Sequence, residues 1–329
     1  YIYKKTNDVW STTPYTTISM SSDDRDSNNI GAWCINVSMN SDNLMIGTQN
    51  RVHFYKILDT TDVNSRYSGR YKGPNHSSFG NNFEDLGGKE NYEAFWAVEI
   101  QNDYAIAGVY QDSAYIFKRE GTSPNDYWVR DVYNGTDTKY FETIDTIKYF
   151  EFNPGNVADH SESASIYGTD AFVTGHGENP KSVYHFKRET DGWVFKQKII
   201  KTDLVNAGVY SSGDKLSSQV WSKGTSIVQF CDNVLAANNW VFIIDTRGNS
   251  RKGYVHSYYK GTNGIYDISN VSLMAEGDNG NDDFGKVIAY DNSTLVISGG
   301  NNNSSSAYIK IYSLPLDGST EVTTTTTVT

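Results

Sequence analysis

One short aromatic pattern recurs along this chain of 329 residues, and it constrains the fold more than any other feature. The clearest copies are SAYIFKRE at 113–120, SVYHFKRE at 182–189 and SAYIKIYS at 306–313. Further copies begin at Tyr1, Arg51 and Gly253. Their irregular spacing is typical of a structural repeat whose loops vary in length. The sequence therefore predicts a repeat protein with elaborated loops.

All six copies have a residue with an aromatic or imidazole side chain at one shared strand position. That position is occupied by Tyr1, His53, Tyr115, Tyr184, His256 and Tyr308. A half-buried position on an amphipathic strand explains the two histidines better than a ligand role does. The other histidines, His76, His160, His176 and His185, form no H-E-x-x-H or His-x-His pair that would indicate zinc.

A second recurring piece precedes each copy except the first. It reads as an Asx-type turn followed by a short apolar strand: SDNLMIG, QNDYAIAG, GTDAFVTG, CDNVLAAN and DNSTLVISG, which begin at residues 41, 101, 168, 231 and 291. A β-rich run lies before each turn, and a strand marked by Trp or Tyr follows the aromatic copy. Four antiparallel strands with apolar residues on both faces require neighbouring sheets on each side. We therefore expect an all-β fold, a β-propeller with four-stranded antiparallel blades, with six blades preferred and seven next.

The ends of the chain set the expected domain boundaries. Tyr1 aligns within an aromatic strand, so residues 1–315 are expected to form a single propeller domain that starts in the middle of a blade. Residues 316–329 are rich in Thr and are expected to form a linker or tail, suited to O-glycosylation. Two alternatives remain for closing the ring: the tract after Ser313 supplies a strand, or the given N-terminus is a cut.

The last copy allows a family to be named. DDFGKVIAYDNSTLVISGG at 282–300, followed by AYIKIY, resembles the FG-GAP repeats of integrin α-subunit propellers and of many secreted or surface proteins. VYHFKRETDGWVFKQKII at 183–200 carries the same likeness. The resemblance covers most of the chain, although only the last copy has a clear Phe-Gly pair, at Phe284 and Gly285.

Propellers of this family often hold calcium in a D-x-D-G-x-x-D loop, and here the matching positions are short turns such as Asp291–Thr294. No metal site and no cofactor are therefore expected. Two acidic clusters, at 22–29 and 277–283, have suitable oxygen atoms, but solvated turn residues explain them equally well.

Composition excludes some functions. The net charge of −11 and the absence of a Lys/Arg run argue against a nucleic-acid partner. No stretch of about 18 apolar residues occurs, so no membrane span is expected. The given sequence does not begin with a signal peptide, and a leader that has been removed stays open as an alternative. The two cysteines, Cys34 and Cys231, are placed on opposite sides of the channel, so no disulfide is expected, although a bridge stays open as an alternative.

No catalytic signature is found, neither a G-x-S-x-G elbow nor a sialidase-type Asp box, so no catalytic residue is assigned. The expected function is a structural or binding module, not an enzyme, displayed outside the cell or on a cell or virion surface. Its loops would contact protein, glycan or a neighbouring copy. One such loop is expected at 135–159, and its deletion should change partner binding while the protein still folds. The alternative is a propeller hydrolase or lyase that acts on glycans with acids in a central pocket.

N-glycosylation sequons give a weak indication of an extracellular location. Asn36 is a poor acceptor because it belongs to an expected inner strand. The possible acceptors are Asn75, Asn134, Asn270, Asn292, Asn302 and Asn303.

Overall fold

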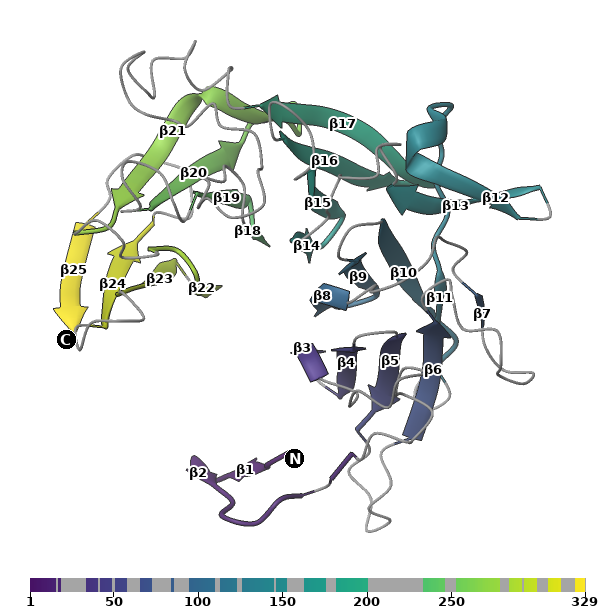
Figure 1. The fold of residues 1–329 in the computed structure, drawn as a ribbon, viewed down its shortest axis with the longest axis horizontal. Helices are drawn as coiled ribbons and strands as arrows, with labels where there is room; N and C mark the ends of the chain where they lie inside the picture. Colours follow the sequence, from purple (N-terminus) through teal and green to yellow (C-terminus); the bar gives the residue numbers. More distant parts are fainter. Residues whose placement is uncertain are drawn as a thin grey trace, which may run out of the picture.

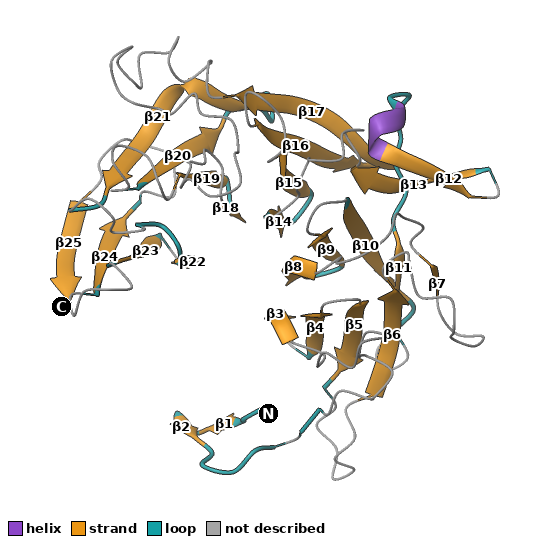
Figure 2. Ribbon diagram, in the orientation of Figure 1, coloured by secondary structure: helices purple, strands orange, loops and turns teal. Residues whose placement is uncertain are grey.

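A computed structural model gives the fold. It describes residues 1–15, 17–18, 34–40, 42–48, 51–57, 66–72, 84–85, 95–109, 113–122, 126–144, 146–152, 163–175, 182–200, 233–245, 253–278, 284–291, 293–300, 307–314 and 323–328. These residues are almost entirely strands and the loops between them (Figure 2). Within these ranges, no helix is long and apolar enough to cross a membrane.

Five antiparallel sheets stand side by side in an open arc around a common centre (Figure 1). In each sheet the first strand lies nearest the centre, and the chain runs outward through the next three strands. The prediction of an all-β propeller with antiparallel blades is confirmed. The prediction of six or seven blades is wrong, because the described chain forms five. The miscount arises at Tyr1, where the sixth aromatic copy forms a hairpin of two strands instead of a blade.

The strand bounds follow the order of the chain. The N-terminal hairpin is β1 (Lys5–Thr6) and β2 (Val9–Trp10). Blade 1 has β3 (Cys34–Asn40), β4 (Asn43–Thr48), β5 (Arg51–Lys56) and β6 (Arg66–Lys72), with β7 (Glu84–Asp85) parallel to β6. Blade 2 has β8 (Phe95–Gln101), β9 (Tyr104–Val109), β10 (Ala114–Glu120) and β11 (Tyr127–Arg130), with β12 (Phe141–Ile144) and β13 (Ile147–Phe152) added. Blade 3 has β14 (Ala164–Tyr167), β15 (Asp170–Gly175), β16 (Ser182–Glu189) and β17 (Gly192–Ile200).

The last two blades have four strands each. Blade 4 has β18 (Asn233–Ala237), β19 (Trp240–Asp245), β20 (Tyr254–Lys260) and β21 (Tyr266–Glu276). Blade 5 has β22 (Ile288–Asp291), β23 (Thr294–Gly299), β24 (Tyr308–Ser313) and β25 (Thr323–Val328).

Blade 4 corrects the expected position of one turn. The sequence reading placed a turn at Asp232-Asn233 and made the following run the second strand. In the structure Asn233–Ala237 is the first strand, and the two-residue turn falls at Asn238-Asn239. Asn238 has a φ of 55°, a left-handed conformation that asparagine tolerates better than most residues. The run expected as the first strand, 226–231, lies outside the described residues.

The aromatic column is in register in four blades. His53, Tyr115, Tyr184 and His256 pair with equivalent residues of the second strand. In blade 5 the equivalent residue is Lys310, which pairs with Ile297, and Tyr308 lies two residues earlier on the same face of β24.

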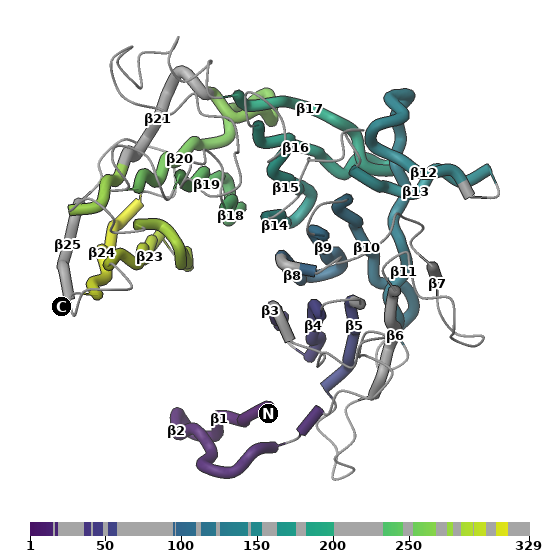
Figure 3. Tube along the Cα trace, viewed as in Figure 1, coloured from purple at the N-terminus to yellow at the C-terminus, as the bar shows by residue number. Residues whose placement is uncertain are grey.

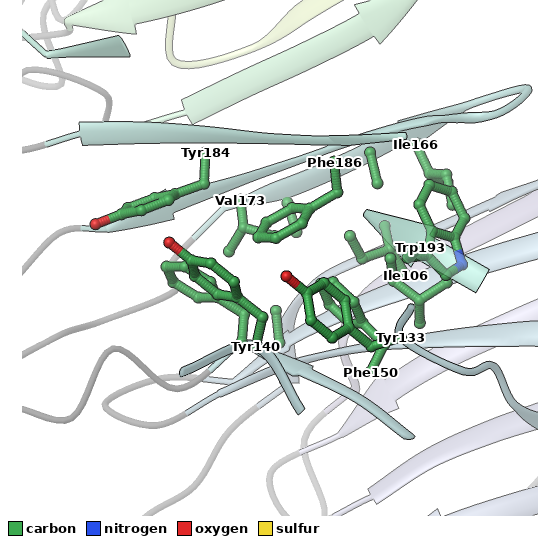
Figure 4. Close-up of a cluster of buried hydrophobic side chains, with 14 of the residues drawn as sticks. Ile106, Tyr133, Tyr140, Phe150, Ile166, Val173, Tyr184, Phe186 and Trp193 are labelled. Carbon is green, nitrogen blue, oxygen red and sulfur yellow. The ribbon is translucent and has the colours of Figure 1, made fainter. Parts of the chain in front are cut away.

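A second correction concerns residues 135–159, which the sequence reading treated as a loop that could be deleted without unfolding the protein. Part of this segment forms β12, β13 and a short 3₁₀-helix at Thr138–Tyr140. Tyr140, Phe150 and Phe152 from it are buried in the core between blades 2 and 3, as Figure 4 shows for the first two. Truncation of one buried leucine or phenylalanine side chain costs about 2–5 kcal/mol. Because the deletion removes several buried aromatic side chains at once, it would unfold the protein.

Four apolar cores lie between successive blades. The core between blades 2 and 3 is the most aromatic; there Phe150 meets Phe186 edge to face with ring centroids 4.9 Å apart (Figure 4). The second strands of blades 2, 3 and 4 supply side chains to the cores on both of their faces, which is why their sequences do not alternate.

The Phe-Gly pair in blade 5 has a packing role. Phe284 is fully buried in the core between blades 4 and 5. Gly285 has a φ of 92°, and a Cβ there would lie 2.5 Å from the Ile244 Cγ2 of blade 4. Only glycine allows both the conformation and the close approach.

The C-terminal tract differs from the linker or tail expected at 316–329. Thr323–Val328 pairs antiparallel with β24 and becomes the fourth strand of blade 5. Threonine is β-branched and favours strands, so a polar Thr run can fill an outer strand that needs no apolar face.

Candidate functional site

Hydrogen bonds from side chains join the inner strands of successive blades. Ser38 in β3, Glu99 in β8 and Ser165 in β14 occupy the same place, two residues before the end of their strand. In each case the side-chain oxygen accepts a bond from a backbone N–H of the next blade: Ile100 at 3.0 Å, Ile166 at 2.9 Å and Ala236 at 2.8 Å. Leu235 occupies the place in blade 4, so the series ends there.

Glu99 is the exceptional member, because it puts a carboxyl group where the other two blades have a serine. Its Oε2 also accepts a bond from the Ser165 hydroxyl at 2.5 Å. Burial raises the pKa of Glu99 to about 7, and the two hydrogen bonds only partly oppose that rise. Glu99 is therefore protonated or half-protonated at neutral pH.

This pKa predicts that stability falls as pH rises. Between about pH 4.5 and pH 7 the folded protein keeps a proton on Glu99 that the unfolded chain loses, so the free energy of unfolding drops by up to about 3 kcal/mol. Glu99→Gln should remove this dependence on pH. The free energy of unfolding of the variant should match that of the wild type at low pH and exceed it above pH 7. Urea unfolding across that range measures the effect. Glu120→Gln is the control, because the Glu120 side chain is 40% exposed. An unchanged slope in Glu99→Gln would contradict the assignment.

Charged pairs recur between blades. Each of the four interfaces between successive blades carries one Lys or Arg bonded to an Asp of the neighbouring blade. In blade order the pairs are Lys56–Asp126, Arg188–Asp131, Lys260–Asp170 and Lys310–Asp278. These ionisable groups are thus engaged in holding blades together.

Asp131 shows how completely such a pair is built. Its Oδ2 accepts from the Arg188 Nε at 2.7 Å and from the Trp193 indole Nε1 at 2.9 Å, and its Oδ1 accepts from the Val132 N–H. The Arg188 Nη2 also donates to Oδ1, at 3.3 Å, so all four lone-pair sites of this carboxylate are directed toward protein donors.

Asp170 and His185 form the arrangement most similar to a catalytic pair. The His185 Nε2 lies 2.8 Å from the Asp170 Oδ1, and Lys260 bonds to the other carboxylate oxygen. Burial alone would raise the pKa of Asp170, but His185 and Lys260 hold it below its usual value. Burial lowers the pKa of His185, so the ring is neutral at neutral pH and donates from Nε2.

The surroundings of His185 favour a structural role. The ring is fully buried, stacks on Phe172 with centroids 4.7 Å apart, and meets Tyr266 edge to face at 5.2 Å. No substrate reaches a ring enclosed in this way. His53 and His256, expected to be half-buried, are also buried, and burial lowers the pKa of His256 to about 3.

An apolar cavity of about 720 Å³ lies between the N-terminal hairpin and blade 1. Tyr1 and Tyr3, which precede β1, and Trp10 in β2 line it from one side, and Val37 and Met39 line it from β3. All five side chains are exposed, with Trp10 at 63% and Met39 at 59%. Exposed apolar groups gathered in this way mark an interaction site more often than scattered ones do.

The sequence-predicted sites are only partly described. Asn134 is exposed, Asn270 lies in β21, and Asn36 lies in β3 with its Oδ1 bonded to the next N–H. Asn75, Asn292, Asn302, Asn303 and Cys231 lie outside the described residues, as does the acidic cluster at 22–29. Of the second cluster, Asp278 is described, and it pairs with the Lys310 Nζ at 2.5 Å. The described ranges contain no group of three His, Cys, Asp or Glu that could hold a metal ion.

Sequence reasoning missed Glu99 and the four pairs between blades. Glu99 stands in the run EAFWAVEI, which indicates a strand and nothing more. The signal that would have found it is positional, since it aligns with Ser38 and Ser165 only once the turns are in register.

No family model matches the chain, and no curated protein matches its sequence. Solved structures with a similar shape include a protein from Lactobacillus plantarum (10% identity, 89% of this chain and 84% of that one, TM-score 0.38). The N-terminal domain of Nup159 has 8% identity and a TM-score of 0.37, and the match covers 84% of this chain and 59% of that one. A GH43 endo-arabinanase from Bacillus licheniformis has 12% identity and a TM-score of 0.32, and the match covers 86% of this chain and 95% of that one. These similarities are too low to indicate a function, and the assignment of the fold rests on the sheet topology.

Proposed function

We propose that this protein is a binding module of FG-GAP type, displayed outside the cell or on a cell or virion surface, and that it acts by contacting a protein partner. The observation that carries the proposal is the open apolar surface around the 720 Å³ cavity between the N-terminal hairpin and blade 1. Aromatic residues such as Tyr and Trp are enriched where proteins bind one another.

The ionisable groups support the same proposal. Three of the pairs between blades engage buried Asp side chains with a buried Lys or a partly buried Lys or Arg, and aromatic rings pack against His185. The net charge of −11 disfavours a nucleic-acid partner.

The test compares two tyrosines with the same exposure. Tyr3 lines the cavity and Tyr127 lies on β11 of blade 2, and both are 46% exposed. Tyr3→Ser should release a stoichiometric partner that co-purifies with the native protein and re-forms the complex when purified. Tyr127→Ser should retain it. A complex indifferent to Tyr3→Ser, or the absence of any stoichiometric partner, would contradict the proposal.

A second candidate is a glycan hydrolase or lyase, and Glu99 is the observation that favours it. A carboxyl group with a pKa of about 7 on an inner strand suits a general acid at neutral pH. Turnover on a panel of polysaccharides, lost in Glu99→Gln while folding is retained, would support this function. No turnover on any of them would leave Glu99 with a structural role.

A further inference from the structure

The N-terminal hairpin has the pairing register of the outer half of a blade. In β1–β2, Lys5 pairs with Trp10 and Thr6 with Val9. In β16–β17 of blade 3, Arg188 pairs with Trp193 and Glu189 with Gly192. The two hairpins therefore correspond residue by residue, with Trp10 in the place of Trp193. By this correspondence β1 is a third strand and β2 a fourth strand.

Burial separates the two hairpins. Tyr184, Phe186 and Trp193 are 3%, 0% and 0% exposed in blade 3. Their counterparts Tyr1, Tyr3 and Trp10 are 81%, 46% and 63% exposed. The difference arises because β16 pairs with β15, whereas within the described chain β1 pairs with β2 alone. The hairpin thus has the core side chains of a blade without the two inner strands that would cover them.

The cavity lies where those two strands would pack. In Figure 3 the hairpin stands at one end of the arc, beside blade 1, and blade 5 stands at the other end. Val37 and Met39 point from β3 into the cavity, as residues of an inner strand do when the neighbouring blade is present. Blade 5 is exposed as well, at Val287 (66%) and Ile309 (41%).

We infer, as an extension of the proposed function, that the partner supplies a two-stranded β-hairpin. The second strand of that hairpin pairs antiparallel with β1, and the hairpin fills the cavity and completes a sixth blade. Addition of a strand to an open edge is an established mode of peptide recognition, in which backbone bonds give affinity and alternate side chains give specificity. The cavity volume alone would also suit a small apolar ligand, but such a ligand would leave the edge of β1 unpaired.

Charge favours a partner over a second copy of this chain. Each copy carries a net charge of −11, so two copies repel. The N-terminal segment is locally basic: Lys4 is exposed and lies over the Tyr15 ring, and Lys5 is exposed and pairs with Asp8. If an incoming strand repeats the register of blade 3, the residue opposite Lys4 corresponds to Asp170. An acidic residue at that position would complement the hairpin.

The probe is a peptide of residues 163–175, which form the β14–β15 hairpin of blade 3. Labelled with a fluorophore and added to the full chain, it should bind saturably in a polarisation assay. A scrambled peptide, and one with proline in place of Phe172 and Val173, should bind at least tenfold more weakly, because proline removes backbone donors. Trp10→Lys and Met39→Lys should weaken binding to the same extent, and Tyr127→Lys should not.

Four results would overturn the inference. The native and scrambled peptides could bind equally, which indicates an apolar pocket without strand pairing. The free chain could self-associate in a manner that Trp10→Lys abolishes, which makes a second copy the occupant. Trp10 could already be shielded from a soluble quencher, which means that the position is filled. The peptide could also fail to bind while the native complex still depends on Tyr3, and in that case the proposed function survives and only the strand pairing fails.

Discussion

Trp193→Ala is expected to lower the free energy of unfolding by about 3–5 kcal/mol. The indole is fully buried between blades 2 and 3, where it meets Tyr104 edge to face at 5.5 Å. Its Nε1 also donates to Asp131, so the truncation removes packing and leaves a buried carboxylate with one donor fewer. The midpoint and slope of urea unfolding measure the loss.

Trp10→Ala is the matched control, because Trp10 has the same place in its hairpin as Trp193 and is 63% exposed. A change within about 0.5 kcal/mol is expected for an exposed position. An equally large loss at Trp10 would mean that the hairpin is packed in solution, and it would remove the basis for the open cavity.

Lys56→Met is expected to lower the free energy of unfolding by about 3 kcal/mol, which is the lower end of the range for removing one partner of a buried ion pair. Lys56 is 1% exposed and bonds to Asp126, itself 3% exposed, at 2.9 Å. Burial alone would raise the pKa of Asp126, but the Lys56 bond holds it below its usual value. The substitution leaves that carboxylate buried, with the Arg119 Nη1 at 3.6 Å as partial compensation.

Two further variants make this prediction specific. Lys56→Met combined with Asp126→Leu should recover most of the loss, since apolar pairs often replace buried ion pairs without cost. Lys118→Met, which breaks an exposed pair with Glu120, should change stability by about 0.5 kcal/mol or less. If the double variant is as unstable as the single one, the pair is not the cause. Because the pKa of Asp126 is lowered on folding, its contribution holds above the unfolded pKa and is lost as pH falls through the folded value.

Local pattern was sufficient to predict that the chain forms antiparallel blades and where most of their turns lie. The hairpin turns at Asn102-Asp103 and Gly168-Thr169 occur where Asx and glycine signals indicate them, and apolar runs such as the one beginning at Tyr104 form the second strands. The turn of blade 4 was predicted at the wrong place because Asp232-Asn233 and Asn238-Asn239 give the same local signal. Only strand pairing decides which of two equivalent turns is used.

The candidate site was not predictable in the same way. The cavity is lined by Tyr3 and Trp10 from one end of the chain and by Met39 from β3, and their sequence pattern is that of ordinary blade residues. What distinguishes them is that the described chain provides no inner strands to cover them. The sequence of a residue does not indicate whether the strand that would cover its side chain is present.

The sequence by itself determined the unit of this protein: an antiparallel sheet with turn signals at fixed places, apolar on both faces and therefore obliged to stack. These are consequences of short-range chemistry, which is written into each repeat. Only the tertiary structure decided that five blades form, that Glu99 meets Ser165, and that an Asp pairs with a base across each interface. Such contacts join residues far apart in sequence, and their pKa values and burial depend on which neighbour arrives, so no single repeat specifies them.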